Sequence, residues 1–257
     1  MKITTHRACT AFILLYLAFV LAGCATTTAN TAAEIPAMHT LKDVNDERVA
    51  HVASDPWEGF NRRMYQFNFY FDKYFYIPIV SGYEYITPTF AQTGVSNFFN
   101  NVGEIRTFYN SLLQARGKTS LVTFGRFATN TTIGIGGLFD PATYFGMVRR
   151  QEDFGQTLGT WGASTGPYLV MPVLGPGTVR SHGGFFVDSG IHATIKSAVD
   201  PLGNTENGDA ILAGVSALKA IDTRHQQRFR YYESGYPFEY EIMRYFYQQR
   251  RERLIMK

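Results

Sequence analysis

Cysteine is scarce in this 257-residue chain, which contains only Cys9 and Cys24, both near the N-terminus. The rest of the chain can therefore form neither a disulfide nor a thiolate metal site. The six histidines show no spacing typical of zinc ligands, and no HExxH motif is present. We predict that the protein binds no metal and uses no cofactor.

A strong excess of one charge is also missing. Without residues 1–23, the chain has 22 basic and 21 acidic residues. Nucleic-acid binding depends on clustered positive charge, because the phosphate backbone dominates the affinity. The near-neutral balance therefore argues against general nucleic-acid binding.

The N-terminal apolar run is too short to span a bilayer. Ala11 to Leu21 fall well below the ~20 apolar residues that a spanning helix needs, and basic residues precede them, as in an export signal. The run ends in Leu21-Ala22-Gly23-Cys24, which resembles the bacterial lipobox. We therefore predict a lipoprotein signal peptide over residues 1–23 and a mature chain with covalent diacylglyceryl and acyl groups on Cys24. An uncleaved helix, or a secretory signal with a chance cysteine, is the alternative.

Residues 24–53 are rich in Ala, Thr and charge and show no hydrophobic period, so we predict a flexible lipidated tether. Ala25 stands where an aspartate would resemble an inner-membrane retention signal. We therefore expect the chain to be lipid-anchored on the periplasmic side of a Gram-negative outer membrane. The folded domain then covers residues 54–257.

Aromatic residues are plentiful, with 21 Phe and 16 Tyr, and many fall in one predicted helix that begins near Asp55 and ends at Pro78. Helical spacing places two largely aromatic sets of residues on roughly opposite faces. The first set is Phe60, Met64, Phe67, Phe71 and Tyr74, and the second is Tyr65, Phe69 and Tyr76. A soluble surface helix keeps one face polar, so this helix is either deeply buried or in contact with lipid. The predicted anchor favours lipid.

The remaining pattern predicts a mainly α domain. We expect helices over residues 88–113, 120–129, 153–159, 209–232 and 237–254, and an extended segment over residues 166–172. Gly175-Pro176-Gly177 indicates a turn. The glycines at 134, 136 and 137 favour a turn or a hinge.

One motif raises an enzymatic alternative. Gly162-Ala163-Ser164-Thr165-Gly166 matches the nucleophile elbow of lipases and esterases, with His182 or His192 as base and Asp188 as third member. That mechanism needs a strand before the serine and a helix after it. The pattern here indicates the reverse order, so a membrane-anchored serine hydrolase using Ser164 is the weaker hypothesis, and we expect no enzyme.

Five motifs in order resemble the MlaA (VacJ) family of outer-membrane lipoproteins, from about Asp55 to Ser181. They are Asp55-Pro56-Trp57-Glu58-Gly59-Phe60-Asn61-Arg62, Val95-Ser96-Asn97-Phe98-Phe99-Asn100-Asn101, Gly136-Gly137-Leu138-Phe139-Asp140, Glu152-Asp153-Phe154-Gly155-Gln156-Thr157-Leu158-Gly159 and Gly166-Pro167-Tyr168-Leu169-Val170-Met171-Pro172.

The resemblance implies a single ring-like helical domain embedded in the periplasmic leaflet of the outer membrane. Such a protein removes mislocalised phospholipids from the outer leaflet, passes them to a soluble periplasmic carrier (MlaC-like), and so maintains lipid asymmetry. Family members associate with a trimeric porin. A purely structural envelope lipoprotein is a further alternative, because the residues alone do not reveal transport.

Two segments are our candidates for the lipid passage. Polar residues set among aromatics single out the first helix, and the density of family motif singles out the second segment. The candidate residues are Phe67, Asn68, Phe69, Asp153, Phe154, Gly155, Gln156 and Gly159, with Gly134, Gly136 and Gly137 as a candidate hinge that gates the passage.

Overall fold

The computed structural model describes residues 35, 39, 55–199 and 208–257 of the chain. The predicted signal peptide, Cys24 and all of the predicted tether except residues 35 and 39 lie outside these residues. The helices and strands discussed below all belong to the unit that spans Met38–Lys257. No helix in the described ranges combines the length and the apolar composition that crossing a membrane requires.

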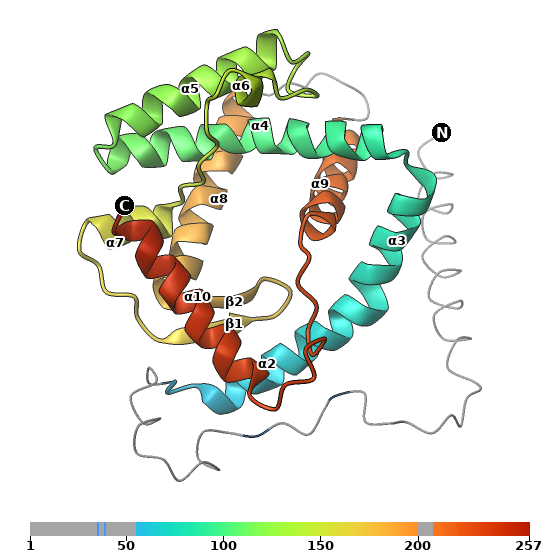
Figure 1. Cartoon of the computed structure of the whole chain (residues 1–257), viewed down its shortest axis with the longest axis vertical. Coiled ribbons are helices and arrows are strands. Elements are labelled where there is room, and N and C mark those ends of the chain that lie inside the picture. Colours follow the sequence, from blue (N-terminus) through green and yellow to red (C-terminus); the bar gives the residue numbers. More distant parts are fainter. Residues whose placement is uncertain (1–34, 36–38, 40–54, 200–207) are drawn as a thin grey trace. The chain divides into compact units, whose positions relative to one another are not determined.

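The unit is mainly helical, as predicted, with one short hairpin (Figure 1). Its helices are α2 (Glu58–Phe71), the π-helical segment η3 (Asp72–Tyr76), α3 (Ile77–Ile86), α4 (Thr89–Leu113), α5 (Gly117–Thr132), α6 (Pro141–Tyr144), α7 (Phe154–Thr160), α8 (Val179–Val199), α9 (Gly208–His225) and α10 (Glu239–Ile255). Its strands are β1 (Tyr168–Met171) and β2 (Gly175–Thr178).

The first helix does not end at Pro78, so that prediction is wrong. The chain continues from α2 through η3 into α3, and Pro78 lies within the first two residues of α3. A proline lacks the amide hydrogen that a helix interior needs. In η3 the pattern of backbone bonds shifts, with the Ile77 amide donating to the Asp72 carbonyl. The proline therefore follows a point where the regular ladder is already interrupted.

The hairpin confirms one sequence prediction and corrects another. The segment predicted to be extended contains β1, but Gly175-Pro176-Gly177 belongs to strand β2 rather than to a turn. The strands are antiparallel, with Tyr168 opposite Thr178 and Met171 opposite Gly175. The turn lies between them, where Val173 has a φ of 66°.

Two asparagines of α2 hold the free edge of β1. The side-chain amide of Asn61 donates to the Tyr168 carbonyl at 3.0 Å, and its oxygen accepts from the Val170 amide at 2.8 Å. Asn68, two helical turns later, makes the same pair of bonds to the Met171 carbonyl (3.0 Å) and the Val173 amide (2.7 Å). An edge strand exposes unpaired backbone groups. The two amides therefore satisfy β1 as a neighbouring strand would.

The main hydrophobic cluster is aromatic and joins α2, β1 and α10. Tyr65, Tyr168, Val170 and Tyr240 are fully buried in it. Tyr65 packs edge-on against Tyr240 and donates its hydroxyl to Glu239 at 2.8 Å. The face of the first helix that carries Tyr65 is therefore buried. The opposite aromatic face, with Phe60, Phe67 and Tyr74, is exposed.

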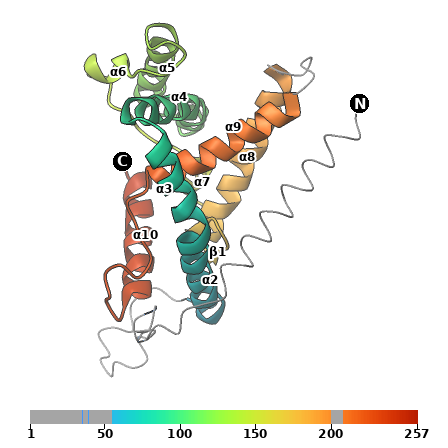
Figure 2. The same ribbon diagram turned by 90° about the vertical axis from the view of Figure 1, so that its right-hand side faces the viewer.

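The helices of the unit surround a central opening in the ribbon, which is the ring-like arrangement predicted. The opening is bordered by α2 and α3, α4, α8, α9 and the hairpin (Figure 1). Contacts of α4 with α7 and α9, of α7 with α8, and of α2 with β1 close the ring. In the view turned by 90°, the far ends of α8 and α9 extend beyond it on the side away from α10 (Figure 2).

Helix α8 was not predicted, and α9 is shorter than predicted. The sequence of α8 contains Gly183, Gly184 and Gly190, which weaken a helical pattern, and α8 shows no apolar stripe. Helix α9 ends at His225, and the following seven residues are irregular rather than helical.

Candidate functional site

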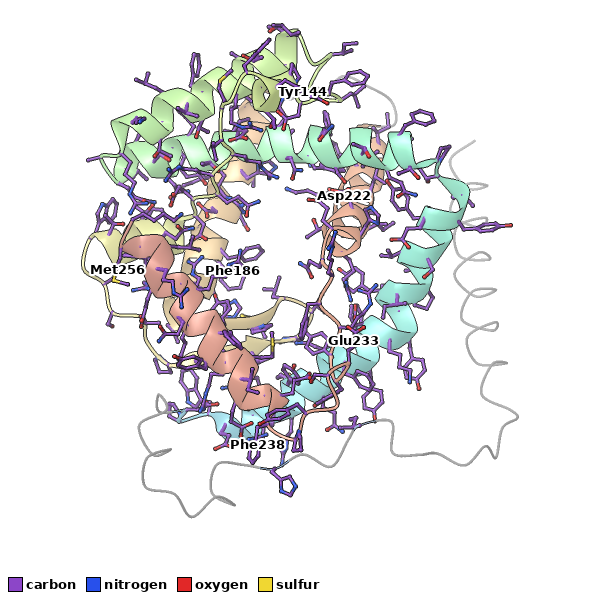
Figure 3. The ribbon with its side chains drawn as sticks, viewed as in Figure 1. Tyr144, Phe186, Asp222, Glu233, Phe238 and Met256 are labelled. Atoms are coloured by element: carbon purple, nitrogen blue, oxygen red, sulfur yellow. The ribbon has the colours of Figure 1, made fainter. Side chains whose placement is uncertain are left out.

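The distribution of apolar side chains is inverted relative to that of a soluble protein. Among the described residues, exposed large hydrophobic side chains far outnumber buried ones, and most fully buried side chains are polar. The most exposed ones concentrate between the end of α3 and the loop after α6. This apolar rim comprises Tyr85, Ile86, Phe90, Leu121, Ile133, Ile135, Phe139, Tyr144, Phe145 and Val148. Tyr144, 91% exposed, lies at the end of α6 (Figure 3).

A buried cluster of charges fixes the rim to α4. Arg126 of α5 donates to Glu104 of α4 at 2.8 Å and to both carboxylate oxygens of Asp140 at 3.0 and 3.1 Å. Burial raises the pKa of the Glu104 carboxyl above its usual value despite the arginine. Removing one partner of such a buried group leaves an uncompensated charge. The cluster therefore makes the rim a fixed part of the ring.

The central opening is bordered on one side by α8. Phe186 lies on the side of α8 that faces the opening (Figure 3), and its side chain is 55% exposed. Phe185 and Val187 beside it are also exposed. An apolar side chain therefore borders the opening, although most of the contacts that hold the opening together are polar.

Asp188 holds α8 against α4 and α7. Its carboxylate accepts from the Tyr109 hydroxyl at 2.6 Å, from the Asn110 amide at 3.0 Å and from the Phe154 backbone N–H at 2.9 Å. Burial and the bond to Asp188 raise the pKa of Tyr109, so the hydroxyl remains a donor. One buried carboxylate thus joins three helices at the wall of the opening.

The predicted segment from Asp153 to Gly159 forms α7 and lies in the same wall. Asp153 caps the helix by accepting from the Gln156 amide at 2.9 Å, and it pairs with both Nη atoms of Arg251 at 2.5 and 2.8 Å. Burial by itself would raise the pKa of the Asp153 carboxyl. Hydrogen bonds from Arg251 and Gln156 outweigh burial and lower the pKa to about 2.

Glycines let α7 and α8 approach closely. A Cβ atom on Gly184 would lie 2.2 Å from the Gly155 nitrogen, and one on Gly155 would lie 2.8 Å from Arg251 Nη2. At Gly159, an added Cβ would lie 2.5 Å from Ile255. We use the name α8 joint for two features taken together. They are the contacts of Asp188 and the close crossing of α7 and α8 at these glycines, which we call the glycine crossing.

Helix α9 lies on the opposite side of the ring, where it packs against α3 and α4 and is joined to η3 and α4 by side-chain hydrogen bonds. Arg224 donates to both carboxylate oxygens of Asp72 in η3, at 2.5 and 2.6 Å, and both residues are buried. The hydrogen bonds that Arg224 donates to Asp72 raise the pKa of Arg224, although burial opposes them. Asp222 accepts from the Ser96 hydroxyl of α4 at 2.5 Å. We call this set of contacts the α9 joint.

The other three passage candidates lie on α2, away from α7. Asn68 clamps β1, and Phe69 is buried against the Tyr232 ring. Phe67 is 44% exposed and stacks on Phe71. No hydrogen bond or ion pair between described residues joins this group to Asp153 and its neighbours, so the candidates occupy two separate places in the ring.

The candidate hinge is a tightly bonded turn after α5. Gly136 and Gly137 have φ angles of 68° and 94°, which favour glycine. A Cβ on Gly134 would lie 2.4 Å from the carbonyl oxygens of Asn130 and Phe139. Its role as a hinge stays a prediction.

The residues of the hydrolase alternative do not assemble. Ser164 is exposed in a loop that follows helix α7 and precedes strand β1, the reverse of the order that a nucleophile elbow needs. His182 bonds to the Leu169 carbonyl at 3.0 Å, and Asp188 is occupied by α4 and α7. No group of three or more metal-ligating side chains occurs within the described ranges.

Sequence comparison agrees with the earlier resemblance. The profile described as MlaA lipoprotein matches residues 53–254. A protein named intermembrane phospholipid transport system lipoprotein MlaA from Escherichia coli is 37% identical over 180 residues, 67% of this chain and 66% of that protein. An uncharacterized protein of Rickettsia felis is 36% identical over 171 residues, 66% of this chain and 65% of that protein. The matches span about half to two thirds of the length of the curated relatives.

One solved structure has a similar fold. Its description reads "Structural basis for maintenance of bacterial outer membrane lipid asymmetry". It aligns with a TM-score of 0.61 at 30% identity and covers 79% of this chain and 100% of that chain.

Proposed function

The chain belongs to the MlaA lipoprotein family, and we propose that it removes mislocalised phospholipids from the outer leaflet of the outer membrane and thereby maintains lipid asymmetry. The single observation that carries this proposal is the inverted surface. Apolar side chains form an outer rim, while polar joints hold the helices around a central opening. The names of the relatives, which describe intermembrane phospholipid transport, agree with it.

The apolar rim suits contact with acyl chains. Transfer of its exposed side chains from water to lipid is favourable by roughly 25 cal/mol per Å². Tyr85 and Tyr144, both more than 90% exposed, have apolar rings with polar tips and suit the edge of a bilayer. We therefore infer that the domain is embedded in the periplasmic leaflet without spanning the membrane.

The central opening would then be the passage. A phospholipid headgroup is charged, and a charge is costly to place in hydrocarbon. A ring within one leaflet offers the headgroup a polar wall while the acyl chains remain near apolar residues such as Phe186. No covalent step is needed, so this proposal requires no catalytic residue.

The anchor and the partners complete the proposal. Acyl groups on Cys24 would hold the domain at the membrane, and a soluble periplasmic carrier would accept the lipid. A trimeric porin would be the neighbour in the membrane. Loss of labelled palmitate from a Cys24→Ser variant, with retention in the parent, tests the anchor directly.

The passage is tested by placing a charge at the opening. In a strain that lacks the chromosomal gene, the parent chain should restore low levels of phospholipid in the outer leaflet. Phe186→Glu should leave at least severalfold more surface phospholipid than the parent chain does. The carboxylate repels headgroup phosphate, and moving it out of water beside acyl chains is costly. The readout is surface accessibility to an added phospholipase, at equal protein levels.

Phe246→Glu is the matched control, since Phe246 is 61% exposed on α10 rather than on α8. Equal function of both variants would refute α8 as the passage wall. Failure of the parent chain to lower surface phospholipid at all would refute the transport function. Ser164→Ala should act like the parent, and its loss of function would favour the hydrolase instead.

A further inference from the structure

One residue of the predicted tether contacts the folded domain. His39 lies fifteen residues after Cys24 and belongs to the same unit as the helices. Its backbone amide donates to the Pro237 carbonyl at 3.0 Å. Its imidazole ring lies 5.9 Å from the Phe238 ring, measured between centroids, with 36° between the ring planes. Pro237 and Phe238 are far from His39 in the sequence, so folding brings these residues together.

The surface that receives His39 is the segment that leads into α10. It consists of Tyr236, Pro237 and Phe238, which we call the tether dock. The Tyr236 and Phe238 rings lie 6.1 Å apart between centroids. Bonds of the first turn of α10 hold the backbone of the dock, because the Glu239 amide donates to the Tyr236 carbonyl and the Ile242 amide to the Phe238 carbonyl, both at 3.1 Å. The tether dock is therefore a fixed surface.

The folded domain also begins beside the tether dock. Asp55 accepts from the Tyr240 hydroxyl and pairs with Arg244 at 3.3 Å, and both partners lie in the first two turns of α10. Its carboxylate also accepts from the Asn61 amide at 2.8 Å. The chain therefore meets the beginning of α10 at Asp55 and again at His39. The entropy cost of closing so short a loop is lower than that of closing a loop across the whole domain.

The tether dock and the apolar rim lie at opposite ends of the unit. Phe238 lies at one end and Tyr144 of the rim at the other (Figure 3). The view turned by 90° likewise separates α6 from the beginning of α10 (Figure 2). Acyl groups on Cys24 would therefore be connected to the protein at the end away from the rim.

The contact at His39 divides the predicted tether into two parts. For a flexible chain, the fifteen residues from Cys24 to His39 have a root-mean-square reach of about 20 Å. The 31 residues from Cys24 to Asp55 would reach about 30 Å by the same estimate. With His39 in contact, only the first part separates the acylated cysteine from the folded domain.

We propose that the tether docks on Tyr236, Pro237 and Phe238 through His39, so that only the residues before His39 set the reach of the acyl groups. The backbone bond fixes the position of the tether, and the ring contact adds the attraction of a tilted aromatic pair. The acyl groups then hold the dock end of the domain close to the membrane, opposite the rim. The role of the acyl groups rests on the proposed function, whereas the docking contact does not.

Photo-crosslinking in the full lipoprotein tests the contact. p-Benzoylphenylalanine replaces His39, which keeps the backbone amide, and mass spectrometry identifies the crosslinked peptide. The main intramolecular crosslink should lie in the peptide that contains Tyr236 and Phe238. Phe238→Ala should lower its yield severalfold. The matched control Phe246→Ala removes an exposed ring further along α10 and should leave the yield unchanged.

Two matched insertions test the reach without altering the folded domain. The same thirty-residue Gly/Ser segment is inserted after Asn30, before the contact, or after Glu47, behind it. Spin labels on Ala25→Cys and Tyr245→Cys report the distance by double electron–electron resonance in mild detergent. The insertion after Asn30 should lengthen this distance, because the estimated reach from His39 to residue 25 grows from about 20 to about 35 Å. The insertion after Glu47 should leave the distance as in the parent.

Releasing the contact should abolish the difference between the two insertions. The double variant His39→Pro/Phe238→Ala lacks the amide hydrogen and the partner ring. Both insertions then lie between residue 25 and Asp55, so they should lengthen the distance equally. The tether dock is overturned if the two insertions act equally in the parent, or if neither changes the distance. It is also overturned if the crosslink forms outside the dock peptide.

The outcomes for the dock and for the proposed function are separate. The insertions are measured again in a Cys24→Ser background, which keeps the spin labels specific if the cysteine carries no acyl group. A difference between the insertions in that background supports the tether dock even if palmitate labelling shows no anchor. In that case the role of the acyl groups is overturned and the contact at His39 stands.

Discussion

The two sides of the central opening are held in different ways. At the α8 joint, backbone atoms of α7 and α8 touch at Gly155 and Gly184, and the Asp188 carboxylate bonds to a backbone amide. At the α9 joint, the bonds to η3 and α4 run between side chains, chiefly the pair of Asp72 and Arg224. A backbone contact cannot separate without losing close packing, whereas a side-chain pair can break and re-form. We therefore expect that any widening of the opening occurs on the α9 side.

The location of η3 strengthens this contrast. A π-helical segment interrupts the regular bonding of the long first helix where Asp72 meets Arg224. Such segments frequently occur at functional sites. The α9 joint therefore combines an irregular helix with a single buried ion pair, and the α8 joint has neither weakness. The predictions below test this difference, beginning with the largest effect.

Gly184→Ala should destabilise the fold most, by about 4 kcal/mol, because the added Cβ would lie 2.2 Å from the Gly155 nitrogen and 2.6 Å from its Cα atom. The helices α7 and α8 would have to separate. Chemical unfolding followed by circular dichroism measures the loss.

The neighbouring Gly183 supplies the matched control. Nothing lies within 4 Å of a Cβ added there. Gly183→Ala should therefore stabilise the protein by about 0.5–1 kcal/mol through helix propensity. Similar effects of the two substitutions would contradict the close crossing of α7 and α8.

Arg224→Met should cost about 3 kcal/mol, because it leaves the Asp72 carboxylate buried without its partner. The double variant Asp72→Leu/Arg224→Met removes both charges and should recover most of that loss. Urea unfolding of the two single variants and the double variant gives the coupling energy. If the double variant is as unstable as Arg224→Met, the buried unpaired charge of Asp72 does not account for the loss of stability.

Much of the fold was predictable because its helices follow the hydrophobic period. The first helix, α4, α5 and α10 were identified in this way, and a short helix was also predicted over residues 153–159, where α7 lies. Helix α8 was missed because glycines replace its apolar stripe, at the positions where α7 crosses it. Those same glycines now explain the α8 joint.

The site was less predictable than the fold. Asp153 was singled out from its motif, but its partner Arg251 lies 98 residues further along the chain. Asp188 was considered only as a catalytic acid, although its bonds to three helices make it structural.

Asp153→Asn should have the smallest of the three destabilising effects, and that effect should depend on pH. The pKa of the Asp153 carboxyl is lowered from 3.8 to about 2 by Arg251 and Gln156, against burial. A lowered pKa in the folded state stabilises the protein above pH 4, and this stabilisation, about 2 kcal/mol, is lost as the pH falls towards 2. The free energies of unfolding of parent and variant should therefore differ at pH 7, and the difference should narrow steadily as the pH falls towards 2.

Other carboxyl groups also titrate in this range, so the difference between parent and variant is the decisive quantity. Asp209→Asn, at an exposed position at the start of α9, should show little change in that difference with pH. A gap between parent and Asp153→Asn that stays constant from pH 7 to pH 2.5 would contradict the ion pair. A gap that closes would show that α10 is held to α7 by one charge pair, between Arg251 and Asp153 at the N-terminus of α7. Acid should then loosen α10 from α7 before it separates the glycine crossing, because the crossing contains no group that titrates.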